Sequence, residues 1–260
     1  MTTRGHDPLA PIASAYAGLV ENLASLTTGR TRRGPGGAVL AVTGAPVASL
    51  NGIVAPGLEP DPDEIAALAA SEPWGDVPWG VHVRGVPGPG VTEVAARHGL
   101  TLFHRTPLMV RHPEQGMPEE PATRSLKVRA IGGNEFDVYV AIMAEGFEVP
   151  PEVFRVFADP ALDRMTGATF FLAEADGVPV GTGMAIVTGE LTGIFNISTL
   201  PAHRRRGHGT AITMEMVRTG WAAGATTAYL YASEMGQPVY AAAGFRTEEH
   251  LTTISAPTPA

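Results

Sequence analysis

The sequence has no cysteine and little basic charge. The absence of cysteine excludes disulfides, thiolate catalysis and cysteine-based metal sites, and leaves the redox compartment open. Lys and Arg number 18 against 26 Asp and Glu, for a net charge of −8, so we expect neither nucleic acid nor an anionic membrane as a partner. No apolar run reaches the roughly 18 residues of a membrane span, and the N-terminus lacks the apolar core of a signal peptide. These absences predict a soluble, cytoplasmic protein.

The composition of the chain is that of a globular protein. Hydrophobic residues make up 44% and charged residues 17% of the chain. A length of 260 residues suits two small domains. The polar, proline-containing run that begins at His112 has no periodicity and is interpreted as a linker. We therefore predict a domain over 1–111, a linker over 112–124 and a second domain over 125–260.

Hydrophobic periodicity and turn residues predict alternating strands and helices in both halves. In the N-terminal half we expect a helix over 9–27, strands over 38–43 and 46–54, a helix over 61–70, a strand over 79–84, a helix over 90–98 and a strand over 100–110. In the C-terminal half we expect a strand over 125–131, helices over 134–147 and 150–158, strands over 168–175, 179–187 and 191–200, a helix over 207–221, a strand over 226–232, a helix over 237–243 and a strand over 245–254. This order predicts an α/β fold: a mixed sheet with helices packed on its faces.

One short segment carries a chemical signal. The strand that ends at Pro201 crosses three arginines and enters a helix through Gly207-His208-Gly209. A helix start offers unpaired N–H groups and a positive dipole end, glycines allow close approach to the backbone, and arginines add charge. Together they suit a pyrophosphate. A Walker loop is excluded because Thr210-Ala211 follow Gly209, and a dinucleotide fingerprint because Ile212 occupies its third glycine position.

The spacing of this segment is that of a known family. Arg204-Arg205-Arg206-Gly207-His208-Gly209 fits the Arg/Gln-x-x-Gly-x-Gly/Ala signature of GNAT N-acetyltransferases, and the later Tyr240-Ala241-Ala242-Ala243-Gly244-Phe245 fits their Tyr-x-x-x-Gly-Phe. The sequence resembles this family over roughly residues 125–255. The resemblance implies a GNAT acyl-CoA acyltransferase fold with acetyl-CoA as co-substrate and no metal.

The resemblance also assigns roles to positions of this chain. It places pantetheine along the strand that contains Ile197, Ser198 and Thr199, with one N–H group on the thioester carbonyl. The pyrophosphate would lie on the backbone of Arg205, Arg206, Gly207, His208, Gly209 and Thr210, with Arg204 adding charge at the rim. Ser233 stands where many relatives have a coenzyme-contacting Asn, and its side chain is shorter than that of Asn.

Catalytic roles are less determined. The resemblance makes Tyr240 the general acid for the leaving thiolate, although a helix tyrosine packed on the sheet is the alternative. Glu190 and Glu234 are candidate bases, and solvated turn residues are the alternative interpretation of both. Relatives with a glutamate on the penultimate strand have it where Ala228 stands here, which favours a water chain or another acid as the base. We expect exposed structural roles for His203 and His208. Glu145 and Glu148 either select a cationic substrate or are surface charges.

The N-terminal half resembles the degenerate first half of tandem GNAT proteins. It has no Arg-x-x-Gly-x-Gly between a strand and a helix, so we expect it to buttress the other half and shape the acceptor cleft. The predicted function is acetyl transfer to a primary amine of a small molecule, amino acid or peptide. A non-catalytic acyl-CoA-binding regulatory module and an acyltransferase with another acyl-CoA or a hydroxyl acceptor are the alternatives. The sequence leaves a homodimer open.

Overall fold

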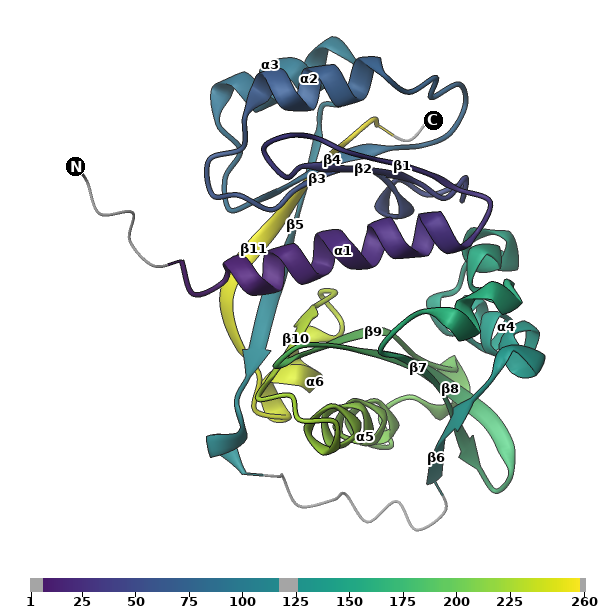
Figure 1. The fold of residues 1–260 in the computed structure, drawn as a ribbon. Coiled ribbons are helices and arrows are strands. Elements are labelled where there is room, and N and C mark those ends of the chain that lie inside the picture. The colour runs from purple at the N-terminus through teal and green to yellow at the C-terminus, as the bar shows by residue number, and fades with distance from the viewer. Residues whose placement is uncertain (1–6, 117–125, 258–260) are drawn as a thin grey trace.

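A computed structural model describes residues 7–116 and 126–257, which form one mixed sheet flanked by helices (Figure 1). The sheet has 11 strands in the order β1-β2-β3-β4-β11-β5-β10-β9-β8-β7-β6. The strands are β1 Arg30–Arg33, β2 Val39–Val42, β3 Asn51–Ala55, β4 Gly80–Arg84, β5 Leu102–Arg111, β6 Leu126–Ile131, β7 Ala168–Ala175, β8 Val178–Thr188, β9 Leu191–Thr199, β10 Thr227–Tyr231 and β11 Arg246–Ser255. The predicted mixed α/β fold is confirmed.

The α-helices lie close to their predicted positions. They are α1 Ala10–Leu26, α2 Pro62–Ala70, α3 Pro89–Arg97, α4 Phe136–Phe147, α5 His208–Ala222 and α6 Gln237–Ala242. The segment Pro151–Ala158, called η4, is a 3-10 helix, as are η1 Ala48–Leu50, η2 Pro113–Gln115, η3 Gly133–Glu135, η5 Pro160–Arg164 and η6 Pro201–His203. None of the helices within the described residues is long and apolar enough to cross a membrane.

Two local predictions needed correction. The strand predicted over 46–54 is shorter, because residues 48–50 form a 3-10 turn before β3. The Asn51 side chain holds this turn by donating to the carbonyls of Ala45 and Val47 and accepting from the N–H of Thr43. The sequence reading also missed β1, a fully exposed Arg-rich edge strand with no hydrophobic alternation. Most of the predicted linker, residues 117–124, lies outside the described residues.

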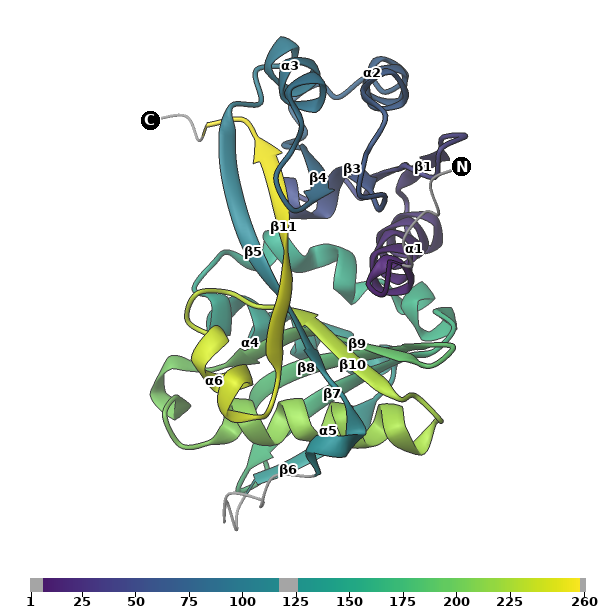
Figure 2. The same cartoon turned by 90° about the vertical axis from the view of Figure 1, so that its left-hand side faces the viewer.

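The two halves exchange their last strands. β5 follows α3 in the chain but lies between β10 and β11, and β11 lies between β5 and β4. Both pairings of β5 and the β11–β4 pairing are antiparallel. Figure 2 shows β5 and β11 as two long strands running from one part of the molecule to the other. The predicted division at 111/125 therefore separates residues that share one sheet, and it remains a prediction.

The halves have the same order of elements but differ where a coenzyme would bind. In each, a hairpin (β2–β3, β8–β9) is followed by a helix, a parallel strand (β4, β10), a helix and the exchanged strand. β3 and β4 pair over four residues, from Gly52 to Ala55. At the helix that follows, the Asp61 side chain caps the N-terminus and the first turn carries Asp63 and Glu64. Those carboxylates repel a phosphate, so this helix start is unsuited to a coenzyme.

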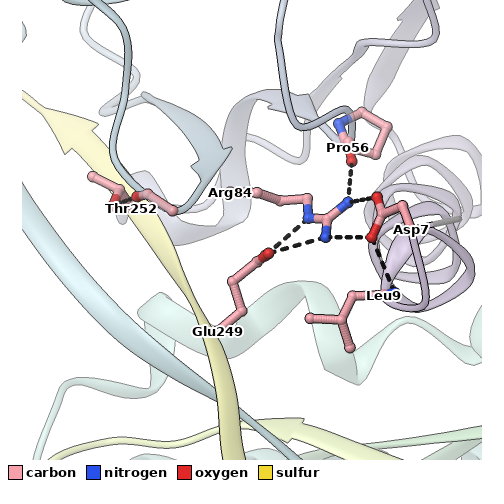
Figure 3. Close-up of polar contacts among 7 residues, drawn as sticks. Asp7, Leu9, Pro56, Arg84, Glu249 and Thr252 are labelled. Carbon is pink, nitrogen blue, oxygen red and sulfur yellow. Dashed lines mark hydrogen bonds and ion pairs between the residues drawn. The ribbon is translucent and has the colours of Figure 1, made fainter. Parts of the chain in front are cut away.

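Helix α1 lies between the two parts of the sheet, across β2 on one side and β9 on the other (Figure 1). Its start is fixed by Arg84 of β4, whose side chain is 3% exposed. The Arg84 guanidinium donates to the Glu249 carboxylate of β11 at 2.8 and 2.9 Å and to Asp7 at 3.0 Å (Figure 3). Asp7 lies three residues before the first residue of α1, so one buried arginine joins the start of the first helix, β4 and the last strand.

Candidate active site

The site begins with an opening between two parallel strands. β9 and β10 pair only through Leu191–Thr227, Thr192–Ala228 and Gly193–Tyr229. Beyond Gly193, no strand of the described residues pairs with β9 on this side, whereas β10 continues against β5 as far as Tyr231. The remaining length of β9 thus presents an unpaired edge, which an extended ligand can use as a strand does.

A bulge shapes the open edge. Asn196 has φ +55°, a left-handed conformation that is uncommon outside glycine, and the β8–β9 register shifts beside it. The hydroxyl of Thr182 lies 2.7 Å from the Asn196 carbonyl, to which it donates, and 2.7 Å from the Ser198 hydroxyl. Because Leu200 donates its N–H to Val180 of β8 at 2.9 Å, the backbone of Thr199 points away from β8, toward the opening.

The N-terminus of α5 lies directly after this strand and its loop. Gly207, at φ +79°, leads into the helix, no side chain caps the first turn and no acidic residue lies in it. The N–H groups of His208, Gly209 and Thr210 therefore lack helical partners. A Cβ added to Gly209 would come no closer than 3.8 Å to another atom, that of Val239 on α6. The exposed Arg205 and Arg206 add positive charge, so the geometry and the field favour an anion.

Arg204 differs from its two neighbours. The prediction gave it charge at a phosphate rim, but its guanidinium donates to the carbonyl of Gly146 at 2.8 Å and of Thr199 at 3.3 Å. A weaker ion pair joins it to the exposed Glu148 at 3.6 Å. Arg204 thus ties the end of α4 to the end of β9. Glu148 is thus an exposed charge that faces an arginine of the same chain, and its role toward a substrate stays a prediction.

The sequence predicted that both histidines of the loop are exposed, and for His208 this was wrong. His208 is 6% exposed, and its ring lies 6.1 Å from that of the half-buried His203. Burial lowers the pKa of His208, and the neighbouring His203 and Arg206 lower it further. Its imidazole is therefore neutral near pH 7. The sequence could not show this, because the side chain is covered by the fold rather than by its neighbours in the chain.

Tyr240 lies on α6, beside the start of α5. It is 9% exposed, packs against Phe245 at 6.3 Å between ring centroids, and has its pKa raised to about 12 by burial. A Cβ on Gly236 would meet its Cε2 atom at 2.7 Å, so only glycine leaves room for the ring. Ser233 accepts the Gly236 N–H at 3.1 Å and closes the turn that precedes α6.

The two candidate bases are placed differently. Glu190 lies in the exposed β8–β9 turn, and its carbonyl accepts the N–H groups of Thr226 and Thr227 at the closed end of the strand pair. Seven residues of strand separate it from Ile197, roughly 23 Å at 3.3 Å per residue. Glu190 is therefore not brought to the opening. Glu234 is exposed in the turn between β10 and α6, the helix that carries Tyr240.

The sequence reading missed the aromatic residues at the closed end of the opening and the Thr182 hydroxyl. Tyr16 of α1 lies 4.7 Å from Tyr231 and 6.4 Å from Phe195, between ring centroids. No local pattern connects a helix near the N-terminus with strands near the C-terminus, so only the fold identifies them. Among the described residues, no three His, Asp or Glu side chains are grouped to hold a metal ion.

Comparisons with known proteins agree with this geometry. Residues 138–245 match the model of the acetyltransferase (GNAT) family. A solved GCN5-related N-acetyltransferase from Kribbella flavida is similar over 98% of both chains, with a TM-score of 0.71 and 23% identity. A protein of unknown function from Staphylococcus epidermidis is similar over 89% of this chain and 95% of that one, with a TM-score of 0.60 and 12% identity.

A third structure, a putative GNAT-family acetyltransferase from Novosphingobium aromaticivorans, is similar over 94% of this chain and 96% of that one, with a TM-score of 0.56 and 16% identity. At these identities the solved structures establish the fold alone. No curated protein matches the sequence. The family model spans α4 to Phe245, and so includes the strand opening, the α5 N-terminus and Tyr240. Residues 138–245 therefore form a domain that matches the acetyltransferase (GNAT) family, within a chain that has the fold of GNAT structures.

Proposed function

We propose that the protein transfers an acetyl group from acetyl-CoA directly to a primary amine of a small molecule, amino acid or peptide. One observation carries the proposal: the unpaired edge of β9 runs into an uncapped, acid-free helix N-terminus. Pantetheine on the edge and pyrophosphate at the helix start would occupy two consecutive segments of chain. The open edge supplies backbone hydrogen bonds, and the helix start, with Arg205 and Arg206, supplies the field for the anion.

The chemistry is a single displacement. The lone pair of a neutral amine attacks the thioester carbonyl carbon, a C–N bond forms, the C–S bond breaks and its electron pair goes to sulfur. A backbone N–H on the open edge, that of Ile197 or Thr199, donates to the carbonyl oxygen as negative charge develops there. The amine gives up one proton and the thiolate gains one, so the products are an N-acetyl amide and coenzyme A.

Tyr240 is the candidate donor of the proton to sulfur. With a pKa of about 12 its phenol is protonated at all physiological pH values. Against a free thiol pKa of about 8.5, complete transfer in its ground state would be uphill by about 5 kcal/mol. Donation therefore accompanies the growth of charge on sulfur. For the proton of the amine, Glu234 and a chain of water molecules remain the candidates, since Glu190 lies at the opposite end of β9.

The test is the release of coenzyme A. Protein, acetyl-CoA and a panel of amines are mixed, and free thiol is followed with a chromogenic thiol reagent. Because the chain has no cysteine, every thiol detected belongs to the coenzyme. Amine-dependent thiol release matched by N-acetyl product supports the proposal. Tight acetyl-CoA binding without turnover on any amine would instead favour the non-catalytic regulatory module, and turnover with longer acyl-CoA or hydroxyl compounds the other acyltransferases.

A further inference from the structure

Three half-buried aromatic residues meet where the strand opening begins. Phe195 and Tyr231 lie two residues beyond the last β9–β10 pair, Gly193 and Tyr229. Tyr16 of α1 contacts both, with ring centroids 6.4 Å from Phe195 and 4.7 Å from Tyr231. The buried Tyr229 supports Phe195 edge-on at 5.9 Å. A residue of the N-terminal half thus bridges the two strands where they separate.

These rings lie on the face of the sheet opposite to α5. Ile194 and Leu230 pack in the cluster that contains Ile212 of α5. Because successive side chains of a strand point to opposite faces, the next residues, Phe195 and Tyr231, face α1. A coenzyme whose pyrophosphate lies at the start of α5 would bring its thioester toward the closed end of the opening. The α1 face is then the side from which an acceptor reaches the carbonyl carbon.

The charge beside the rings is negative. Arg84, Asp7 and Glu249 form one network with a single positive and two negative charges, a net of −1 (Figure 3). Burial is the main cause that raises the pKa of Tyr231, and Tyr16, Tyr229 and Glu249 raise it further while Arg84 lowers it. Glu249 of this network is thus one of the charges that the Tyr231 phenol senses. Aromatic faces in a negative field attract organic ammonium ions.

We propose that Tyr16 of α1 determines acceptor specificity in the acyl-transfer centre. Its ring, with that of Tyr231, binds the apolar body of a cationic amine, and the Glu249 carboxylate draws the ammonium group. The ammonium loses its proton to solvent before it attacks. This inference rests on the proposed acetyl transfer and names its acceptor class. It also gives the N-terminal half a function that does not require a second coenzyme site.

Arg84 and Asp7 act as positioning residues. Asp7 lies two residues before Leu9, the N-cap of α1, and its Oδ1 atom accepts from Arg84 at 3.0 Å and from the N–H of Leu9 at 3.1 Å. This contact fixes the start of the helix, and Tyr16 follows two turns later on the same rigid rod. Loss of the Asp7 carboxylate would let the ring shift relative to Tyr231, although no atom of Asp7 reaches the rings.

The experiment compares two acceptors that differ in charge. Phenethylamine is a cation with an aromatic body, and phenylalanine adds a carboxylate to the same body. We expect kcat/KM for phenethylamine to be at least tenfold higher. Tyr16→Leu should lower it by about five- to twentyfold through the acceptor KM while the Kd for acetyl-CoA stays within twofold. Tyr16→Phe keeps the ring and should retain at least half of kcat/KM, and Glu249→Gln should narrow the preference for the cation.

A control on the same helix separates specificity from packing. Leu26 is the last residue of α1, ten residues after Tyr16, and it packs against the core cluster that contains Phe136 and Tyr139 of α4. Leu26→Ala should lower stability without changing the acceptor KM. Equal KM changes in Leu26→Ala and Tyr16→Leu, or a preference for phenylalanine, would overturn the proposal.

A direct binding measurement keeps the inference distinct from the proposed reaction. If no amine is acetylated, the proposed function fails, yet phenethylamine binding to the coenzyme A complex is still measurable by calorimetry. Binding that weakens at least fivefold in Tyr16→Leu would support the acceptor surface on its own. Binding that is absent, or unchanged in Tyr16→Leu, would reject it.

Discussion

Arg204 and its two neighbours should respond to mutation in opposite ways. Arg204 donates to the carbonyls of Gly146 and Thr199, whereas Arg205 and Arg206 are exposed. Hydrogen bonds from a charged donor contribute about 1.5–3 kcal/mol each. The Thr199 contact is long and the Arg204 side chain is 27% exposed, so we expect Arg204→Met to lower the free energy of unfolding by about 2–4 kcal/mol. For a chain of this size that corresponds to a Tm lower by roughly 5–10 °C.

The matched variants Arg205→Met and Arg206→Met should leave Tm within about 2 °C, because neither makes a protein contact of that kind. Each should instead weaken acetyl-CoA binding by about three- to tenfold, with a smaller loss at high salt, since it removes an exposed charge near the phosphates. Thermal unfolding and calorimetric titration of the three variants side by side measure both quantities. An Arg204→Met protein with unchanged Tm and greatly reduced affinity would show that this arginine serves the coenzyme, and the account of the loop would be wrong.

Three further predictions follow. Tyr240→Phe should lower turnover by about 10²-fold while the Kd for acetyl-CoA changes little, and unchanged turnover in this variant would remove the phenol from the mechanism. Because the pKa of Tyr240 is about 12, the pH–rate profile of the wild type should show no loss from its ionisation below pH 11. Gly207→Val should weaken acetyl-CoA binding at least tenfold, because φ +79° is strained for a β-branched residue; an unaffected Kd would locate the phosphates elsewhere. Burial lowers the pKa of His82 to about 4. The unfolded state therefore binds more protons than the folded state below pH 6.5, and the free energy of unfolding should fall by about 2 kcal/mol between pH 7 and pH 5. In urea titrations His82→Gln should flatten this pH dependence, and an equally steep slope in the variant would contradict it.

The parts of the site that the sequence predicted are local in the chain. Pro201 ends β9, and Gly207 and Gly209 open α5, so strand, loop and helix follow from residues that are neighbours in sequence. The same holds for the short helix that carries Tyr240. Each of these signals depends on turn chemistry and periodicity, which act over a few residues.

What the sequence did not predict depends on packing between distant segments. Arg204 is chemically identical to Arg205, and only the position of α4 shows that its partner is the Gly146 carbonyl. The bulge at Asn196 is held by the Thr182 hydroxyl of β8. The burial of His208 results from the fold around it. Glu190 is a candidate base in the sequence, but the β9–β10 register places it before Leu191, at the paired end of the two strands and away from the opening. The exchange of β5 and β11, and with it the approach of α1 to the opening, has no signature in local sequence.

The most direct test of the central claim is the fate of the acetyl-CoA thioester in the presence of an amine. The cysteine-free chain allows thiol release to be read without background, alongside mass spectrometry of the amine. With phenethylamine we expect equimolar coenzyme A and N-acetyl product, and Gly207→Val should lose at least tenfold in acetyl-CoA affinity. A wild-type protein that does not bind acetyl-CoA at millimolar concentration would contradict it.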